Sequence, residues 1–192
     1  RYEDILGTYL TKLCRQQITA DDSRTVSELL KVIGDFERIS DHSVNLLESA
    51  EELRKKAMEF SAPAKDELHT MCMALDEILS ITLDAFVNND PQKATQVEPL
   101  EQVIDVLKAS LRNSHIVRLK NGECTVEAGF VWSDLLTNLE RSSDHCSNIA
   151  VCVIDMHEHN MNSHECLRHI KNDSEFFKEK YEQYLSKYSV HA

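Results

Sequence analysis

Carboxylate residues are spaced four apart at three places in this chain, in the pattern Glu-x-x-x-Asp: Glu37 with Asp41, Glu101 with Asp105, and Glu140 with Asp144. Residues four apart lie on the same side of an α-helix, one turn from each other. Carboxylates that face one another across two helices offer oxygen ligands to a cation such as iron, manganese, magnesium or zinc. The spacing therefore predicts carboxylate metal sites, with Asp4 as a further member.

Two of these pairs lie inside a repeated stretch of sequence. The stretch "FERISDHSVNL" covers residues 36–46, and "LERSSDHCSNI" covers residues 139–149, with six of the eleven aligned positions identical. The offset between the copies is 103 positions (140 − 37), and Asp4 precedes Asp105 by a similar 101 positions (105 − 4). A tandem duplication explains both correspondences.

The carboxylates fall on or beside helical stripes of apolar residues. Plotted at the helical period, Glu37 lies on a face shared with Val26, Leu29, Leu30, Ile33, Phe36, Val44 and Leu47. Glu140 and Asp144 lie among Phe130, Leu136, Val151 and Ile154. Glu101 and Asp105 lie at the edge of a stripe formed by Val97, Leu100, Ile104 and Leu111. An unpaired carboxylate on a core-facing stripe is costly, so protonation, a basic partner or a cation must compensate. His42 and His145 point to the flank of each stripe, and we expect them to form hydrogen bonds at the surface or between helices.

Long helices must position these groups. The 192 residues include only four glycines and three prolines, with 42% hydrophobic residues, which favours an all-α fold with few loops. Turn and cap signals predict helices at about 1–17, 20–60, 61–87, 91–119 with a kink or restart at Pro99, 126–159 and 163–188. The halves correspond in order, so we predict two tandem three-helix bundles, 1–88 and 89–192. The first helix is expected to lack its beginning.

The composition argues against several function classes. A net charge of −12 disfavours nucleic-acid binding, because the chain would repel phosphate backbones. Di-metal carboxylate enzymes of helical bundles use Glu-x-x-His, which is absent from the chain, as are G-x-S-x-G and glycine-rich phosphate loops. We therefore predict that the chain is not an enzyme.

The doubled pattern E-R-x-x-D-H-x-x-N, as "ERISDHSVN" and "ERSSDHCSN", together with "LEQVID", resembles the PhoU domain across essentially the whole chain. The resemblance implies two similar three-helix bundles and, in some members, iron or zinc clusters bound by E/D-x-x-x-D pairs. It points to a metal set of Asp4, Glu37, Asp41, Glu101, Asp105, Glu140 and Asp144.

PhoU domains occur as free-standing regulators of phosphate ABC transport and as cytoplasmic tails of sodium/phosphate cotransporters. The stretch "YEDILGTYLTKL" resembles the tail form more closely, so we expect a regulatory domain on the cytoplasmic side of the plasma membrane, within a membrane protein. Its partners would be the transporter's membrane domain or phosphate-signalling proteins, with a homodimer as a further possibility. The alternatives are the free-standing cytoplasmic regulator and a metal-free helical adaptor whose carboxylates pair with Arg or Lys across a dimer.

Overall fold

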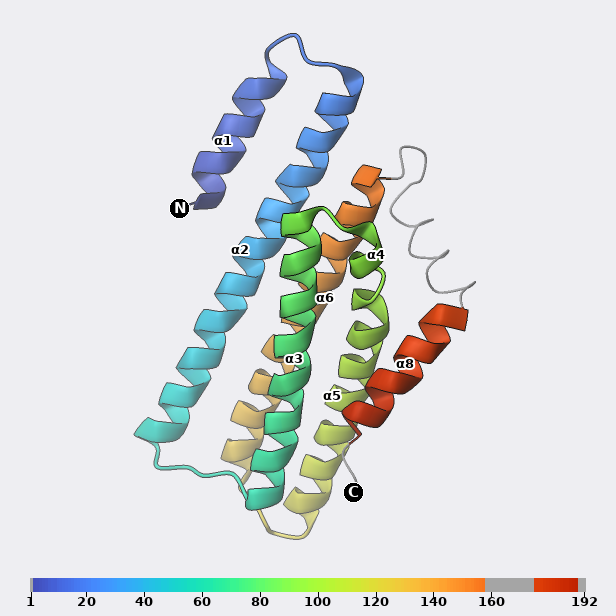
Figure 1. The fold of residues 1–192 in the computed structure, drawn as a ribbon. Coiled ribbons are helices and arrows are strands. Elements are labelled where there is room, and N and C mark those ends of the chain that lie inside the picture. The colour runs from blue at the N-terminus through green and yellow to red at the C-terminus, as the bar shows by residue number, and fades with distance from the viewer. Residues whose placement is uncertain (1, 158–174, 190–192) are drawn as a thin grey trace.

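The computed structural model describes residues 2–157 and 175–189. Every regular element in these ranges is a helix, which confirms the all-α prediction. The elements are α1 (Tyr2–Cys14), α2 (Ala20–Lys55), α3 (Ala62–Asn88), the short α4 (Pro91–Ala94), α5 (Val97–Lys120), α6 (Val126–His157) and α8 (Glu175–Lys187) (Figure 1).

Local signals set several helix starts as predicted. The Thr19 hydroxyl accepts a hydrogen bond from the Asp22 backbone N–H (3.1 Å), and the Asp22 carboxylate accepts one from the Thr19 N–H (3.2 Å), forming a capping box. Asp90 caps α4 through the Lys93 N–H (3.0 Å). A helix restart was expected at Pro99, and α5 begins just before this residue, at Val97. Pro99 therefore lies in the first turn of α5, where its missing N–H costs nothing. The start predicted for the last helix, near residue 163, lies outside the described residues.

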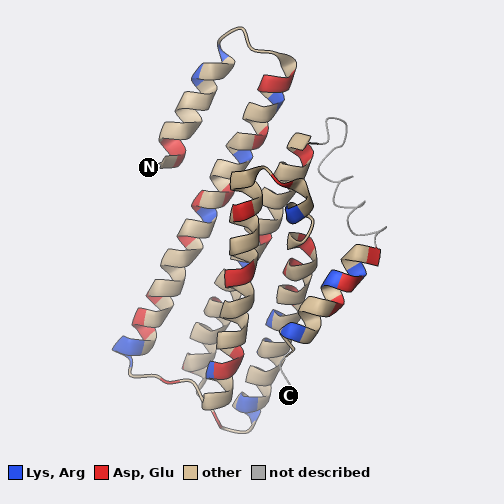
Figure 2. Cartoon of the chain, viewed as in Figure 1, with Lys and Arg blue, Asp and Glu red and all other residues tan. Residues whose placement is uncertain are grey.

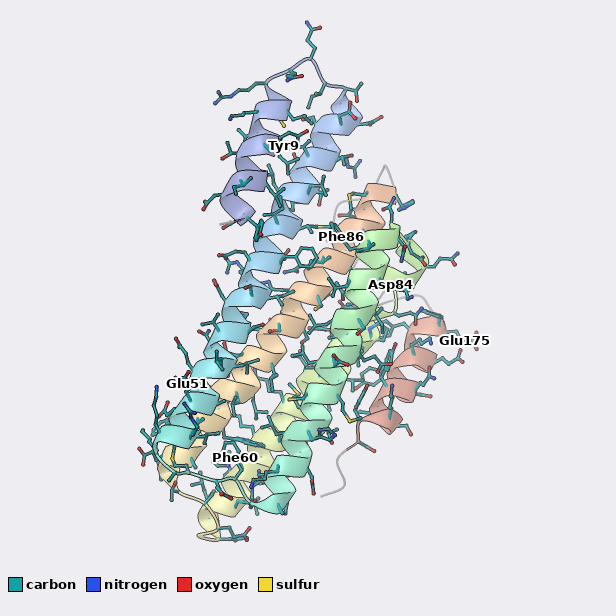
Figure 3. All side chains as sticks on the ribbon, turned by 60° about the vertical axis from the view of Figure 1, so that its left-hand side comes forward. Tyr9, Glu51, Phe60, Asp84, Phe86 and Glu175 are labelled. Atoms are coloured by element: carbon teal, nitrogen blue, oxygen red, sulfur yellow. The ribbon has the colours of Figure 1, made fainter. Side chains whose placement is uncertain are left out.

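The core is centred on α3, α5 and α6, with α8 lying against α5. Ile78 of α3, Leu100, Ile104 and Leu111 of α5 and Trp132 of α6 have at most 1% of their surface exposed. The apolar stripe predicted on α5 is therefore buried as expected. Figure 3 shows Phe60 at one end of this bundle and Phe86 near the other end of α3. The Phe86 ring contacts the ring of Phe36 on α2 edge-on, with centroids 5.4 Å apart.

The long helices α2 and α6 run antiparallel along each other, and theirs is the most extensive contact between elements. The α1–α2 hairpin extends beyond the ends of the other helices (Figure 1), and α1 buries none of its residues. The predicted burial of the α2 stripe is wrong at Val44 and Leu47, which are 52% and 61% exposed. The reason is that α3 packs on α5 and α6 and leaves this part of α2 uncovered among the described residues. Phe130 is likewise exposed.

The division into units 1–88 and 89–192 stays a prediction. The helix α3 belongs to the first of these units in sequence, yet its backbone lies against α5 and α6 of the second. The two predicted units therefore share one set of packed helices around the α2–α6 pair.

Candidate functional site

Carboxylates of the second half come together between α5 and α6. One carboxylate oxygen each from Glu101, Asp105 and Asp144 lie within 4.8 Å of one another. Glu101 and Asp105 are one turn apart on α5, as the four-residue spacing predicts, and Asp144 approaches from α6. Glu101 and Asp144 are partly buried, while Asp105 is exposed. Three of the four residues predicted to converge here thus form an oxygen-rich group.

The fourth residue, Glu140, has a basic partner within the chain. Its Oε2 lies 2.8 Å from Nζ of Lys108 on α5 and 3.9 Å from Nε of Arg141, and the Glu140 side chain is 14% exposed. Lys108 thereby compensates the charge of Glu140, which is the basic-partner outcome that the sequence left open. Arg141 also reaches Asp144, with Nη1 3.4 Å from Oδ2.

Repulsion between neighbouring carboxylates acts on Asp144. Burial raises the pKa of Asp144, and the neighbouring carboxylates of Glu140 and Asp105 raise that pKa further by repulsion, whereas Arg141 and His145 lower it. A cation between these carboxylates would relieve the repulsion. The donor set consists of oxygens alone, which fits a hard or borderline cation.

The corresponding residues of the first half are more spread out. Asp4 borders a groove of about 440 Å³ between α1 and α2, and Glu37 borders a second one of about 300 Å³ with Phe36. Asp41 is exposed on α2. Within residues 2–157 and 175–189, none of these three belongs to a group of three ligand atoms as close as those of the second half. The fit to a metal is therefore better at Glu101, Asp105 and Asp144.

The histidine and asparagine of each repeated stretch form hydrogen bonds with a residue on the helix that carries the other copy. Nδ1 of His42 lies 2.8 Å from Oδ1 of Asn138, and Nδ2 of Asn45 donates to the same oxygen at 3.0 Å. Because this oxygen can only accept, His42 carries its proton on Nδ1. The amide of Asn138 donates in turn to the Asp134 carbonyl (2.8 Å), which holds the acceptor in place.

The reverse contact repeats this geometry with the copies exchanged. Nδ1 of His145 lies 2.8 Å from Oδ1 of Asp35, and Nδ2 of Asn148 donates to that oxygen at 3.2 Å. Asp35 and Asn138 are 103 positions apart (138 − 35), the offset of the repeat itself. We call these two sets of contacts the reciprocal clamps. They confirm that the repeated histidines bond between helices.

Between the clamps, the rings of His42 and His145 stack on each other, with centroids 5.6 Å apart and planes at 24°. The two clamps therefore meet at these stacked histidine rings. The sequence interpretation missed Asp35 and Asn138, although a signal was present. Asp35 precedes His42, and Asn138 precedes His145, by seven residues, which is two helical turns. The two positions are also separated by the repeat offset.

A second polar cluster was also missed, at the end of the bundle where α3, α5 and α6 meet. Arg118 donates to both carboxylate oxygens of Glu67, at 2.8 and 2.7 Å, and both side chains are 8% exposed. The guanidinium lies 5.5 Å from the centre of the Trp132 ring, and His115 stacks on that ring at 5.9 Å. This cluster joins three helices and serves their packing.

The model of the PhoU domain family matches residues 1–50 and 68–153, well over half of the chain and parts of both repeats. The chain belongs to the PhoU domain family. Its curated relatives include the phosphate-specific transport system accessory protein PhoU homolog 1 of Thermotoga maritima, 29% identical over 152 residues, which cover 79% of this chain and 64% of that protein. The homologue of Streptococcus pneumoniae is 26% identical over 137 residues, covering 71% and 62%.

A solved structure, PhoU from Pseudomonas aeruginosa, superposes with a TM-score of 0.71 at 22% identity, covering 82% of this PhoU-family chain and 78% of that one. The likeness shows a shared fold. The chain spans slightly less than two thirds of the length of the two curated relatives above.

The interpretation as the cytoplasmic tail of a sodium/phosphate cotransporter is wrong. The relatives that match are accessory proteins of phosphate-specific transport systems. The repeated motif lies on the helices α2 and α6 that define the domain, so it marks the domain and carries no information about what the domain is attached to. No described helix is long and apolar enough to cross a membrane.

Proposed function

We propose that this chain is a regulatory accessory component of a phosphate-specific transport system, and that it acts in the cytoplasm by binding a partner protein, without catalysis. The observation that carries this proposal is the family match over both repeats, together with the names of the curated relatives. The partners would be the transport system itself or the proteins that signal phosphate supply.

The geometry supports a binding role. Among the described residues, the polar side chains that converge are carboxylates, ion pairs and the reciprocal clamps, and each of these joins helices. The α1–α2 hairpin presents Tyr2, Ile5 and Tyr9 to solvent, 81%, 56% and 61% exposed, beside the two grooves described above. Apolar surface of this kind is typical of protein contacts.

The experiment compares phosphate uptake in the source organism before and after deletion of the gene segment that encodes these 192 residues. We expect the deletion to change how uptake depends on external phosphate. A gene copy that carries Ser43→Ala should restore the original dependence, because the Ser43 hydroxyl donates within its own helix (2.9 Å to the Ile39 carbonyl). An uptake response that is the same with and without the segment would refute the proposal.

We further propose that Glu101, Asp105 and Asp144 hold a metal ion, with iron and zinc as the candidates that the family resemblance implies. The three oxygens within 4.8 Å and the raised pKa of Asp144 support this. The contact of Lys108 with Glu140 favours the metal-free alternative for that one residue. Metal analysis of purified protein tests the proposal: wild type should retain iron or zinc that the Asp144→Asn variant lacks, and equal contents would contradict it.

A further inference from the structure

The groove that Glu37 borders between α1 and α2 has an apolar floor. Its volume is about 300 Å³, and Tyr2 and Leu6 of α1 line it together with Ile33 and Phe36 of α2. Leu6 is 46% exposed and Tyr2 is 81% exposed, whereas Ile33 and Phe36 are partly buried. Apolar surface that is hollowed in this way is typical of a binding site for another protein segment. We call it the Glu37 groove.

The repeat places the same surface in the second half of the chain, where a helix covers it. At the offsets of 101 for α1 and 103 for α2, the four apolar residues correspond to Val103, Leu107, Leu136 and Leu139. Each of these counterparts is at most 4% exposed. They belong to one core cluster with Met71, Leu75 and Ile78 of α3, and α3 lies against both α5 and α6.

Among the described helices, none takes the corresponding place on the Glu37 groove. The last helix, α8, lies against α5 instead, and α1 buries none of its residues. The groove therefore presents to solvent the apolar pattern that α3 covers in the second half. A segment that fits this pattern is a helix with apolar side chains along one face, as α3 has at Met71, Leu75 and Ile78.

The charged side chains that line the groove are acidic. They are Glu3 and Glu37, and its described lining includes no lysine or arginine. Glu140, the counterpart of Glu37, pairs with Lys108 at 2.8 Å, but the counterpart of Lys108 is Gly7 (108 − 101), which has no side chain. Among the described residues, Glu37 has no basic partner of its own. A helix that covers the groove removes water from Glu37, so this helix must supply a positive charge.

We propose that the Glu37 groove binds a basic amphipathic helix of a partner protein. Its apolar face packs on Leu6, Ile33 and Phe36, and a lysine or arginine beside that face pairs with Glu37. This proposal rests on the proposed function, in which the chain acts by binding a partner, and it names the chemistry of the segment that is bound.

Fluorescence anisotropy with two helical peptides of about 18 residues tests the proposal on the purified full chain. Both peptides carry fluorescein and have leucine along one face; one has lysine at the remaining positions, and the other has glutamate. We expect the lysine peptide to bind at least about tenfold more tightly than the glutamate peptide. Leu6→Asp should weaken binding of the lysine peptide by about tenfold or more, because it places a charge in the apolar floor.

Leu47→Asp is the matched control. Leu47 is 61% exposed on α2 and lies outside the groove. This variant adds the same negative charge as Leu6→Asp and should keep the wild-type affinity. The comparison separates binding in the groove from general attraction of a basic peptide to an acidic chain, which both variants would strengthen equally.

Reversal of the groove charges provides a second measurement. The double variant Glu3→Lys with Glu37→Lys should bind the glutamate peptide more tightly than the lysine peptide. Its net charge is still −8 (−12 + 4), so a general electrostatic attraction would continue to favour the lysine peptide.

Four results would overturn the proposal. Two are equal affinities of Leu6→Asp and Leu47→Asp, and a lysine preference that persists in the double variant. The third is a wild-type dimer in sedimentation equilibrium that Leu6→Asp dissociates, because a second copy then fills the groove. The fourth is tighter binding of a labelled peptide of residues 175–188 than of the lysine peptide, which would assign the groove to α8. Circular dichroism verifies that each variant is folded. The uptake experiment is independent, so a failure here leaves the proposed function standing.

Discussion

At the scale of single residues, His115 lies in an environment that disfavours its charged form. It is 6% exposed, it stacks on Trp132, and its Nε2 has no partner among the described residues. Burial lowers its pKa, and the neighbouring Arg118 guanidinium lowers that pKa further, although Glu67 opposes this. The ordinary histidine value is about 6.5.

This lowered pKa predicts a pH dependence of stability. Below about pH 6.5 the unfolded chain takes up a proton on His115 before the folded chain does, so this residue makes the free energy of unfolding fall as the pH falls. His115→Gln should therefore reduce the decline in unfolding free energy between about pH 7 and pH 5. Urea unfolding over this range measures the slope.

The control for this measurement is His69→Gln, because His69 is exposed. This variant should keep the wild-type slope. The prediction fails if His115→Gln shows the same pH dependence as wild type, since the absolute stability of the variant does not enter the comparison.

At the scale of helices, the reciprocal clamps predict how α2 and α6 respond to substitution. Asp35→Ala removes the acceptor shared by His145 and Asn148, and should lower the free energy of unfolding by about 1–3 kcal/mol, because two donors lose their partner. Asp35→Asn should cost less, since Asn138 shows that an amide oxygen serves the same purpose in the other copy. Urea denaturation of the two variants measures the difference.

Ser43→Ala on the same helix provides the matched control, because the hydroxyl of Ser43 donates to the Ile39 carbonyl within α2. Its stability should stay near that of wild type. If Asp35→Ala and Ser43→Ala have equal stability, the clamps contribute nothing to the pairing of α2 and α6.

Helix positions also show how far the sequence alone could lead. The capping box of Thr19, the proline start of α4 and the position of Glu101 and Asp105 on one face of α5 depend on local signals and on helical spacing, so they were predictable. The approach of Asp144 to that face depends on how α6 packs against α5. The pairing of Lys108 with Glu140 depends on how α5 and α6 are rotated relative to each other. The exposure of Val44 on α2 results from the packing of α3 against α5 and α6. Neither is encoded in a local pattern.

At the scale of the whole molecule, the excess of acidic residues predicts a response to salt. The chain carries a net charge of −12, and the described acidic residues are spread along several helices, as Figure 2 shows. Self-repulsion of this kind destabilises a compact state, and salt screens it, because the Debye length shortens from about 30 Å at 0.01 M to about 8 Å at 0.15 M.

We therefore expect the urea midpoint of unfolding at neutral pH to rise between these two ionic strengths. Sodium chloride and potassium chloride should act equally, because the effect is one of screening. A midpoint that falls with salt would show that favourable exposed ion pairs, such as Lys55 with Glu51, outweigh the repulsion, and a constant midpoint would show that the two effects balance.

The reciprocal clamps make the two halves of this chain depend on each other. Each clamp takes its acceptor from one copy of the duplicated sequence and its donors from the other, so neither copy can change alone without leaving hydrogen-bonding groups of the other unsatisfied. A half expressed by itself would leave these groups to water. The aspartate at one acceptor and the asparagine at the other show that the copies have diverged in charge while keeping the oxygen in place. Each half therefore depends on the other to satisfy the hydrogen-bonding groups of these two sites.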